Sequence, residues 1–354
     1  MGNSSIKRIL FLLTTLSMLF SLFSCKNKES KQKYTNTYLE YFDTVSTVVG
    51  YFETEDEFEV VSELVEKRLS EYHMLYDIYH TYEGITNLKD INALYDGVHK
   101  EFTVDERIVD MLLFSKEMYI LTVGETNIAM GSVLSLWHNA REAATKNPSD
   151  AAVPLEEELL AAAKHTDIDN LIIDKENKTV FINDPEMTLD VGAVAKGYAT
   201  EMIARELEAL GASGITLNIG GNIRIIGAKP GDEPWVVGIE SPDIYSGSPY
   251  AEYMYLRGGS LVTSGSYQRF YYVDGKNYHH IIDKDTLYPS EYYTSVSVYA
   301  TDSGFADSLS TALFSMDVES GMALIEKLDN VEALWIAKDG TKTYSDGFKN
   351  YCKK

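Results

Sequence analysis

Cysteine is almost missing from this chain of 354 residues, which contains only Cys25 and Cys352. So few thiols exclude a scaffold that depends on several disulfides. The fold must therefore rely on a buried apolar core. A chain of about 330 residues is long enough for one large domain or two intimate ones.

Positive charge is also scarce, since 31 Lys and Arg residues face 54 Asp and Glu residues and the formal net charge is −23. Such a surface repels nucleic acid and anionic membranes, so we expect neither as a partner. A phosphate ligand is not excluded, because backbone amides and a metal ion can hold it locally.

Long apolar runs, linkers and repeats are absent from most of the chain. After the run at residues 9–23, no segment is apolar for long enough to cross a bilayer. No period of 20–50 residues recurs, and no Pro/Gly/Ser-rich linker divides residues 38–354. We therefore expect residues 38–354 to form one compact unit with intimate subdomains.

The N-terminal segment has the layout of a signal peptide. Lys7 and Arg8 precede the apolar run, which ends at Leu22-Phe23-Ser24-Cys25. A small residue directly before Cys resembles a bacterial lipobox. We predict a signal peptide over residues 1–24, lipid on Cys25 and a flexible polar tether over residues 25–37, which anchors the protein to the cell membrane on the extracytoplasmic side. An ordinary signal peptide with an incidental cysteine is the alternative.

Helical and strand patterns alternate irregularly along the rest of the chain, without β-α-β repetition. This predicts an α+β fold with mixed or antiparallel sheets and packed helices. Helices are expected over residues 56–79, 105–122, 148–165, 194–210, 305–314 and 319–328, with a short one near 85–94. Strands are expected over residues 38–53, 171–174, 179–183, 294–300 and 333–337, with successive strands between 215 and 272.

Asp307 and Thr311 lie four residues apart in an amphipathic helical pattern and therefore share a face. A carboxylate and a hydroxyl are oxygen ligands of the kind that Mg²⁺ prefers. Alternatively, the Asp is solvated and the Thr bonds back to its own helix.

Small residues surround Lys196 in residues 189–198, where a strand end runs into a helix start. This composition suits either a phosphate at the helix terminus or tight helix packing. The Gly pair in residues 218–223 marks a turn or a ligand contact, and residues 262–266 are similarly small and polar.

His279 and His280 are adjacent, and in a strand they would face opposite sides. One of them can be a general base, since an imidazole normally titrates near neutral pH, or each can be a hydrogen-bonded structural residue.

Taken in order, these segments resemble the bacterial ApbE family of flavin transferases (FAD:protein FMN transferases). The matching stretches are residues 189–198, 218–223, 263–265, 279–283 and 306–312. Each is weak alone, but their order and spacing agree over the chain from residue 38 onward. Members of this family are often lipoproteins, which fits Cys25.

The resemblance implies an enzyme that uses Mg²⁺ to split FAD at its pyrophosphate. It would move FMN onto a Thr or Ser hydroxyl of a target protein through a phosphoester bond and release AMP. The implied partners are FAD and an extracytoplasmic acceptor protein, belonging to a membrane redox complex.

Site residues follow from the same resemblance. The implied metal ligands are Asp307, Thr311 and the backbone carbonyl of Ala193, and the implied catalytic residues are Asp307 and the base His280. The implied flavin-nucleotide contacts are Phe42, Tyr79, Glu125, Thr126, Asn127, Asp190, Lys196, Ser264, Gly265 and Ile282, with Tyr79 stacking on FAD.

Two departures from the family pattern concern the flavin side. Phe42-Asp43-Thr44 replaces the usual Met-Gly-Thr, and Thr126-Asn127 replaces Phe-Asp. As a separate alternative, the protein is a lipoprotein that mainly hydrolyses FAD or stores flavin. A transporter's substrate-binding lipoprotein is disfavoured, because the chain lacks two-lobe α/β repeats.

Overall fold

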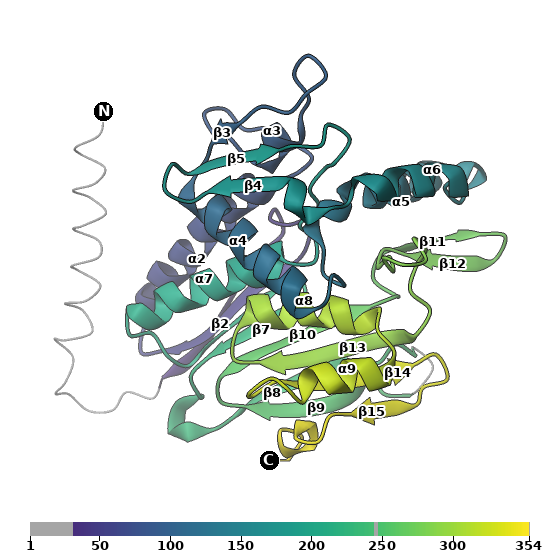
Figure 1. Cartoon of the computed structure of the whole chain (residues 1–354). Coiled ribbons are helices and arrows are strands. Elements are labelled where there is room, and N and C mark those ends of the chain that lie inside the picture. The colour runs from purple at the N-terminus through teal and green to yellow at the C-terminus, as the bar shows by residue number, and fades with distance from the viewer. Residues whose placement is uncertain (1–30, 244–246, 354) are drawn as a thin grey trace.

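The computed structural model describes residues 31–243 and 247–353 (Figure 1). The expected signal peptide, Cys25 and the first part of the expected tether lie outside these residues. Within the described part, no helix has the length and apolar character needed to cross a membrane.

The centre of the molecule is an eight-stranded sheet in which every neighbouring pair is antiparallel. Its strands in spatial order are β1 (Gln32–Tyr38), β2 (Ser46–Phe52), β6 (Ile215–Ile219), β7 (Asn222–Ile226), β10 (Gly259–Gly265), β13 (Tyr293–Ala300), β14 (Glu332–Ala337) and β15 (Lys342–Tyr344).

Three small sheets surround it. They are β3 (Phe102–Thr103) with β5 (Thr179–Ile182) and β4 (Leu171–Asp174), then β8 (Trp235–Glu240) with β9 (Tyr250–Leu256), and β11 (Phe270–Val273) with β12 (Lys276–His279).

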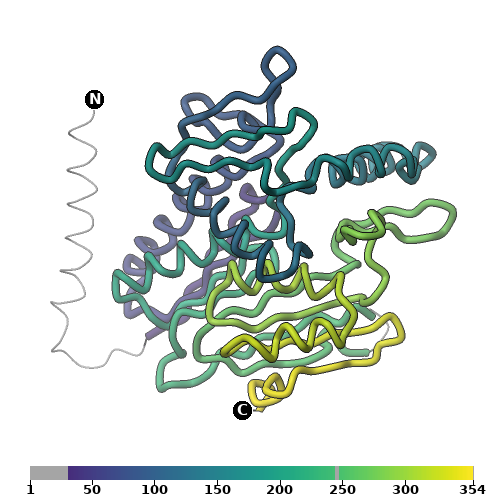
Figure 2. The backbone as a smooth tube through the Cα atoms, in the orientation of Figure 1, coloured from purple at the N-terminus to yellow at the C-terminus, as the bar shows by residue number. Residues whose placement is uncertain are grey.

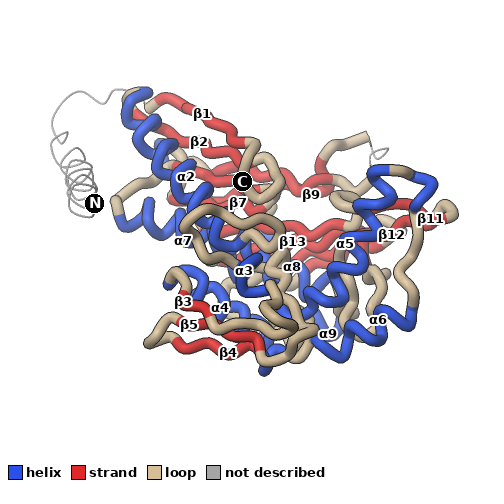
Figure 3. Tube along the Cα trace, turned by 90° about the horizontal axis from the view of Figure 1, so that it is seen from above, coloured by secondary structure: helices blue, strands red, loops and turns tan. Residues whose placement is uncertain are grey.

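The helices are α2 (Glu55–Tyr76), α3 (Leu88–Asn92), α4 (Glu106–Leu121), α5 (Gly131–Lys146), α6 (Glu156–Ala162), α7 (Ala195–Ala209), α8 (Ser303–Phe314) and α9 (Val318–Ile325). Four of them, α2, α7, α8 and α9, lie on the large sheet (Figures 1 and 3). Helices α2 and α7 pack on β2, β6 and β7, and α8 packs on β10 and β13. Figure 2 shows α5, α6 and the β11–β12 hairpin extending from the same side of the body.

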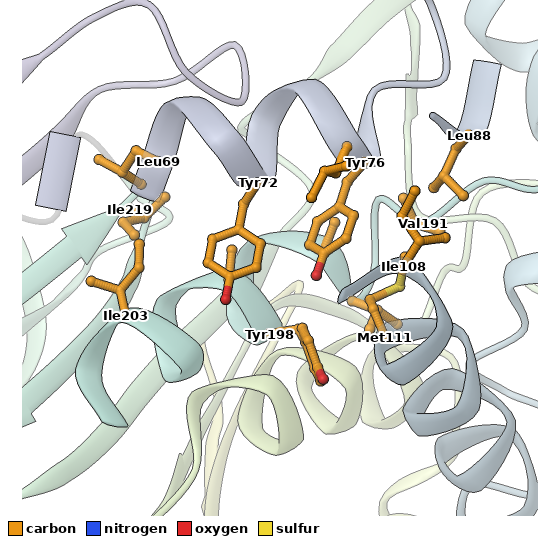
Figure 4. Packing of buried hydrophobic residues seen from close by; sticks show 14 of the residues in the cluster. Leu69, Tyr72, Tyr76, Leu88, Ile108, Met111, Val191, Tyr198, Ile203 and Ile219 are labelled. Atoms are coloured by element: carbon orange, nitrogen blue, oxygen red, sulfur yellow. The ribbon is translucent and has the colours of Figure 1, made fainter. Parts of the chain in front are cut away.

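The middle of the sheet is buried on both faces. Val298 of β13 belongs to the same buried cluster as Leu309 of α8, whereas its neighbour Tyr299 belongs to a second cluster with Trp235 of the β8–β9 hairpin. On the helix side, Figure 4 shows Tyr76 of α2 pointing toward Tyr198 of α7, with ring centroids 6.4 Å apart. Burial on both faces fixes the register of these strands, because a slip by one residue would exchange the two sets of side chains.

The α+β architecture with antiparallel sheets is confirmed, and the expected helices appear as α2, α4, α7, α8 and α9. The prediction of one strand over residues 38–53 is wrong, because a turn separates β1 from β2. Residues 32–37 belong to β1, not to a flexible tether, since β1 pairs along its length with β2 and Tyr34 stacks on Phe58.

The largest errors lie between residues 128 and 165. The expected helix over 148–165 shrinks to α6 and short 3-10 turns, because Pro154 disfavours helical backbone at the residue before it. Helix α5 was not expected. It begins at Gly131 without a side-chain cap, so the usual start signal is absent.

Candidate active site

A cavity of about 810 Å³ lies where α2, α5, the start of α7, α8 and the β11–β12 hairpin meet. It collects most of the residues expected from the sequence: Phe42, Tyr79, Glu125, Thr126, Asn127, Asp190, Ala193, Lys196, His280, Ile282 and Thr311. Segments more than 250 residues apart in sequence therefore contribute to one site. Asp307, Ser264 and Gly265 are not among the lining residues.

Asp307 lies behind the cavity wall, in the contact between α7 and α8. Its Oδ2 accepts a hydrogen bond from the Gly197 N–H at 2.8 Å and lies 3.7 Å from Lys196 Nζ. A Cβ at position 197 would overlap Asp307 and the Ser303 carbonyl, so this close approach requires glycine. Burial raises the pKa of Asp307, and the nearby Lys196 and the amide oppose that rise.

Thr311 follows one helical turn after Asp307 and reaches the cavity. Its hydroxyl makes no hydrogen bond to another described residue, so it has not bonded back to its own helix. The described residues contain no group of three or more His, Cys, Asp or Glu side chains able to hold a metal ion. A metal ion here would be bound by the Asp307 carboxylate, the Thr311 hydroxyl and the Ala193 carbonyl. That oxygen-only set fits Mg²⁺, which keeps water and phosphate as further ligands.

The start of α7 contributes backbone groups to the cavity. Asp190 Oδ1 accepts a hydrogen bond from the Gly192 N–H at 2.8 Å, which shapes the turn before Ala193. The opposite Gly pair also lines the cavity as a tight turn. Gly220 has φ 56°, and a Cβ there would lie 2.5 Å from Thr44 Oγ1. Both glycine segments thus bring backbone close to any ligand.

The two histidines do face different surroundings. His279 is buried, with Nε2 2.8 Å from the Ser290 carbonyl and its ring edge against Phe314. His280, directly after β12, lines the cavity. Its Nδ1 lies 3.2 Å from the Arg269 carbonyl and must donate to it, which leaves Nε2 as the proton acceptor.

The surroundings of His280 shift its imidazole away from the ordinary titration near neutral pH. Burial, together with the positive charge of Arg269, lowers the pKa of His280 to about 3. The ring is therefore neutral at physiological pH. A neutral ring is the state that a general base requires.

A polar network missed by the sequence analysis holds the Tyr79 side of the cavity. Asp77 Oδ1 accepts from the Tyr79 N–H at 2.6 Å, and Oδ2 accepts from Tyr82 Oη at 2.7 Å. Burial raises the pKa of Asp77, but these hydrogen bonds outweigh it and the net pKa is lowered. Because Asp77 directly follows α2, only the helix end could have signalled it.

The same hydrogen-bond network reaches Phe42, the first residue of the Phe42-Asp43-Thr44 segment. Tyr82 Oη lies 3.2 Å from His73 Nε2, and His73 Nδ1 accepts from the Phe42 N–H at 3.2 Å. Phe42 and Asp43 have φ of 55° and 50°, a region that non-glycine residues rarely adopt. His73 therefore helps to fix this strained turn, which stands where the resemblance predicts Met-Gly-Thr.

Tyr79 already has an aromatic neighbour. It stacks on His138 of α5 with ring centroids 4.9 Å apart and planes inclined by 25°. Arg141 Nη2 lies 3.1 Å from His138 Nδ1. One face of Tyr79 is thus covered, and only the other is available to a planar ligand. His138 and Arg141 were missed because they lie on the unexpected helix α5.

Residues 125–127 serve both the cavity and the packing. Thr126 is buried, and its Oγ1 donates to the Ser308 carbonyl of α8 at 2.8 Å. Asn127 caps the short 3-10 turn at residues 128–130, and Glu125 pairs with Lys284 at 3.3 Å. With Thr126-Asn127 at the positions where the resemblance predicts Phe-Asp, this segment of the cavity wall is still bonded to α8 through Thr126.

Ser264 and Gly265 occupy the end of β10. Ser264 Oγ lies 2.8 Å from Ser310 Oγ of α8, so this strand supports the helix that carries Thr311. In this structure the pair supports the site from behind. Direct flavin contact by these two residues stays a prediction.

The fold and the site define a class of α+β proteins whose cavity suits a phosphate-bearing ligand, with a helix start, a buried carboxylate and a neutral imidazole. The chain belongs to the ApbE family, whose family model matches residues 42–335.

Relatives of known name support this membership. A Vibrio cholerae protein named FAD:protein FMN transferase is 34% identical over 238 residues, covering 66% of this chain and 69% of its own. One of the same name from Haemophilus influenzae is 26% identical over 330 residues, or 91% of each chain.

Solved structures agree. The ApbE protein of Thermotoga maritima has 28% identity and a TM-score of 0.79, covering 91% of this chain and 100% of that one. The flavin transferase ApbE of Vibrio cholerae shares the fold, with 24% identity, a TM-score of 0.74 and coverage of 91% and 99%.

The protonation state of His280 is directly testable. We expect its imidazole to stay neutral from pH 8 down to about pH 5, because burial and Arg269 disfavour the charged form. NMR titration of the histidine Cε1–H resonances would show this, with His280→Asn used to assign the signal. A His280 midpoint near the ordinary value of about 6.5 would contradict the prediction.

Proposed function

We propose that this protein is an FAD:protein FMN transferase that transfers FMN to a Thr or Ser hydroxyl of an acceptor protein and releases AMP. The observation that carries the proposal is the position of His280, whose Nδ1 bonds to the Arg269 carbonyl and whose Nε2 can accept a proton, in the same cavity as Lys196 and the start of α7. The family membership and the names of the relatives support the same activity.

In this proposal the acceptor hydroxyl gives its proton to His280 Nε2 while its oxygen forms a bond to the FMN phosphorus. The bond from that phosphorus to the oxygen of the AMP phosphate breaks, and AMP leaves. Lys196 and the positive end of the α7 dipole stabilise the negative charge on the phosphate oxygens. Tyr79, whose backbone N–H is held by Asp77, orients the nucleotide.

We further propose that Asp307, Thr311 and the Ala193 carbonyl hold Mg²⁺. When bound there, the ion would neutralise charge on the phosphate oxygens. Support comes from the free Thr311 hydroxyl and from the single buried carboxylate beside it. Because Asp307 also accepts the Gly197 N–H, its removal would disturb helix packing as well. Thr311 gives the cleaner test.

Thr311→Val should raise the Mg²⁺ concentration needed for half-maximal AMP release by at least about tenfold, since even outer-shell partners of a metal contribute that much. Valine keeps the shape of threonine, so the melting temperature should change little. Thr301→Val, at an exposed position before α8, is the matched control. An unchanged Mg²⁺ requirement in Thr311→Val, or full AMP release in excess chelator, would remove the metal assignment.

The transferase reaction can be tested with purified protein, FAD, Mg²⁺ and a candidate acceptor, read by in-gel flavin fluorescence. His280→Ala should abolish transfer, by about 10²-fold or more, yet keep FAD binding nearly unchanged, because a base acts on the nucleophile. His279→Ala should lower the melting temperature, because His279 packs on Phe314, while turnover per folded molecule persists.

Two results would count against the assignment. Equal loss of turnover in both histidine variants, corrected for folding, would mean that His280 is structural. AMP release without flavin on any acceptor would point to FAD hydrolysis as the activity.

We also propose that the protein is anchored by lipid on Cys25 outside the cytoplasm, where its acceptor would belong to a membrane redox complex. The support is the order of charged, apolar and small residues over positions 1–25. Cys25→Ser should move the protein out of the membrane fraction without changing its specific activity. Sedimentation of this variant with membranes after a high-salt wash would show another mode of attachment.

A further inference from the structure

Two arginines in the cavity wall lack the partner that every other described arginine has. Arg141 of α5 and Arg269, directly before β11, both line the cavity, and neither forms an ion pair with a carboxylate of a described residue. The remaining described arginines each pair with Asp or Glu: Arg68, Arg107, Arg205, Arg224 and Arg257. Because acidic residues outnumber basic ones in this chain, an arginine without a carboxylate partner is unexpected.

Each guanidinium group makes one hydrogen bond to a described residue, and in both cases the acceptor is a neutral group. Arg141 Nη2 lies 3.1 Å from His138 Nδ1, and Arg269 Nη2 donates weakly to the Asp43 carbonyl at 3.4 Å. Asp190 is close enough to influence both electrostatically, but its Oδ1 accepts from the Gly192 N–H instead. Most of the donors on each guanidinium are therefore available to a ligand.

The two arginines also act on each other and on the base. Burial and then the charge of Arg269 lower the pKa of Arg141, and the same two arginines disfavour the protonated form of His280. Like charges near each other repel, and the partial burial of Arg141 adds to the cost of keeping its charge. An anion bound between them would offset that cost.

We propose that Arg141 and Arg269 form an anion subsite that binds the pyrophosphate oxygens of FAD on the wall of the cavity that carries His280. The inference rests on the proposed function, which makes FAD the substrate. Planar guanidinium groups match phosphate oxygens with two parallel hydrogen bonds, which a lysine cannot do. The subsite would act together with Lys196 at the start of α7, so that cationic groups from three segments surround the phosphates.

The test compares ligands with and without phosphate. Affinities for FAD, AMP and riboflavin are measured by calorimetry in excess chelator, where no metal can bridge the phosphates and no acceptor is present. Arg141→Gln and Arg269→Gln should each weaken FAD and AMP binding by about tenfold, as expected for loss of a charged hydrogen-bonding group. Riboflavin, which has no phosphate, should bind equally well to all variants.

Matched controls separate charge from packing. Arg257→Gln removes an exposed arginine outside the cavity that pairs with Asp232, and it should leave all three affinities unchanged. Arg141→Lys and Arg269→Lys keep the charge but lose the planar group, and they should restore only part of the lost affinity. Because Arg269 is exposed at the cavity, its substitution tests the subsite even if Arg141→Gln folds poorly.

Three results would overturn the proposal. One is an equal loss of riboflavin and FAD affinity, which indicates a structural role. Another is unchanged FAD and AMP affinity with a raised KM for the acceptor, which assigns the arginines to an acidic group of the acceptor. The third is wild-type protein that binds neither FAD nor AMP without metal. A protein that binds FAD through these arginines but transfers no FMN would instead keep the subsite and overturn the proposed function.

Discussion

The contact between Gly197 of α7 and Asp307 of α8 is the constraint on which the candidate site depends. The hydrogen bond from the Gly197 N–H to the buried carboxylate holds the two helices closer than any side chain at position 197 would permit. That distance fixes Lys196 and the start of α7 relative to Thr311. The sheet beneath keeps α8 in place, through bonds such as Ser264 to Ser310. The Gly197–Asp307 contact thus positions the side chains that give the site its chemistry.

Much of this site could be predicted from sequence because its chemistry comes in local patterns. Asp307 and Thr311 share one helix face, and the small residues around Lys196 mark a helix start. Arg141, Arg269, His73 and Asp77 could not be predicted. Each is a single polar residue, and only tertiary structure brings it to the cavity. Element boundaries were also hard to predict. Strands buried on both faces lack the alternation of apolar and polar residues. Helix α5 lacks a side-chain cap at its start.

Charge distribution explains how so acidic a chain can receive an anionic substrate. The net charge of −23 describes the chain as a whole, whereas the cavity gathers Lys196, Arg141 and Arg269. Acidic residues also line the cavity, but Asp77 is held by hydrogen bonds and Glu125 is paired with Lys284. At physiological ionic strength, exposed charges more than about 8 Å away are largely screened. Cations next to the bound phosphates therefore matter more for binding than the distant acidic surface. The acidic exterior also discourages unwanted binding to nucleic acid and other polyanions.

The arginines and His280 are linked by more than proximity. In the free protein, burial and the charge of Arg269 keep the imidazole neutral but also make it a weak base. An anion bound by Arg141 and Arg269 would offset their repulsion of a proton on Nε2, whereas burial, the larger cause of the lowered pKa, would remain. If the subsite acts as proposed, this electrostatic contribution favours proton transfer to His280 when the substrate is bound.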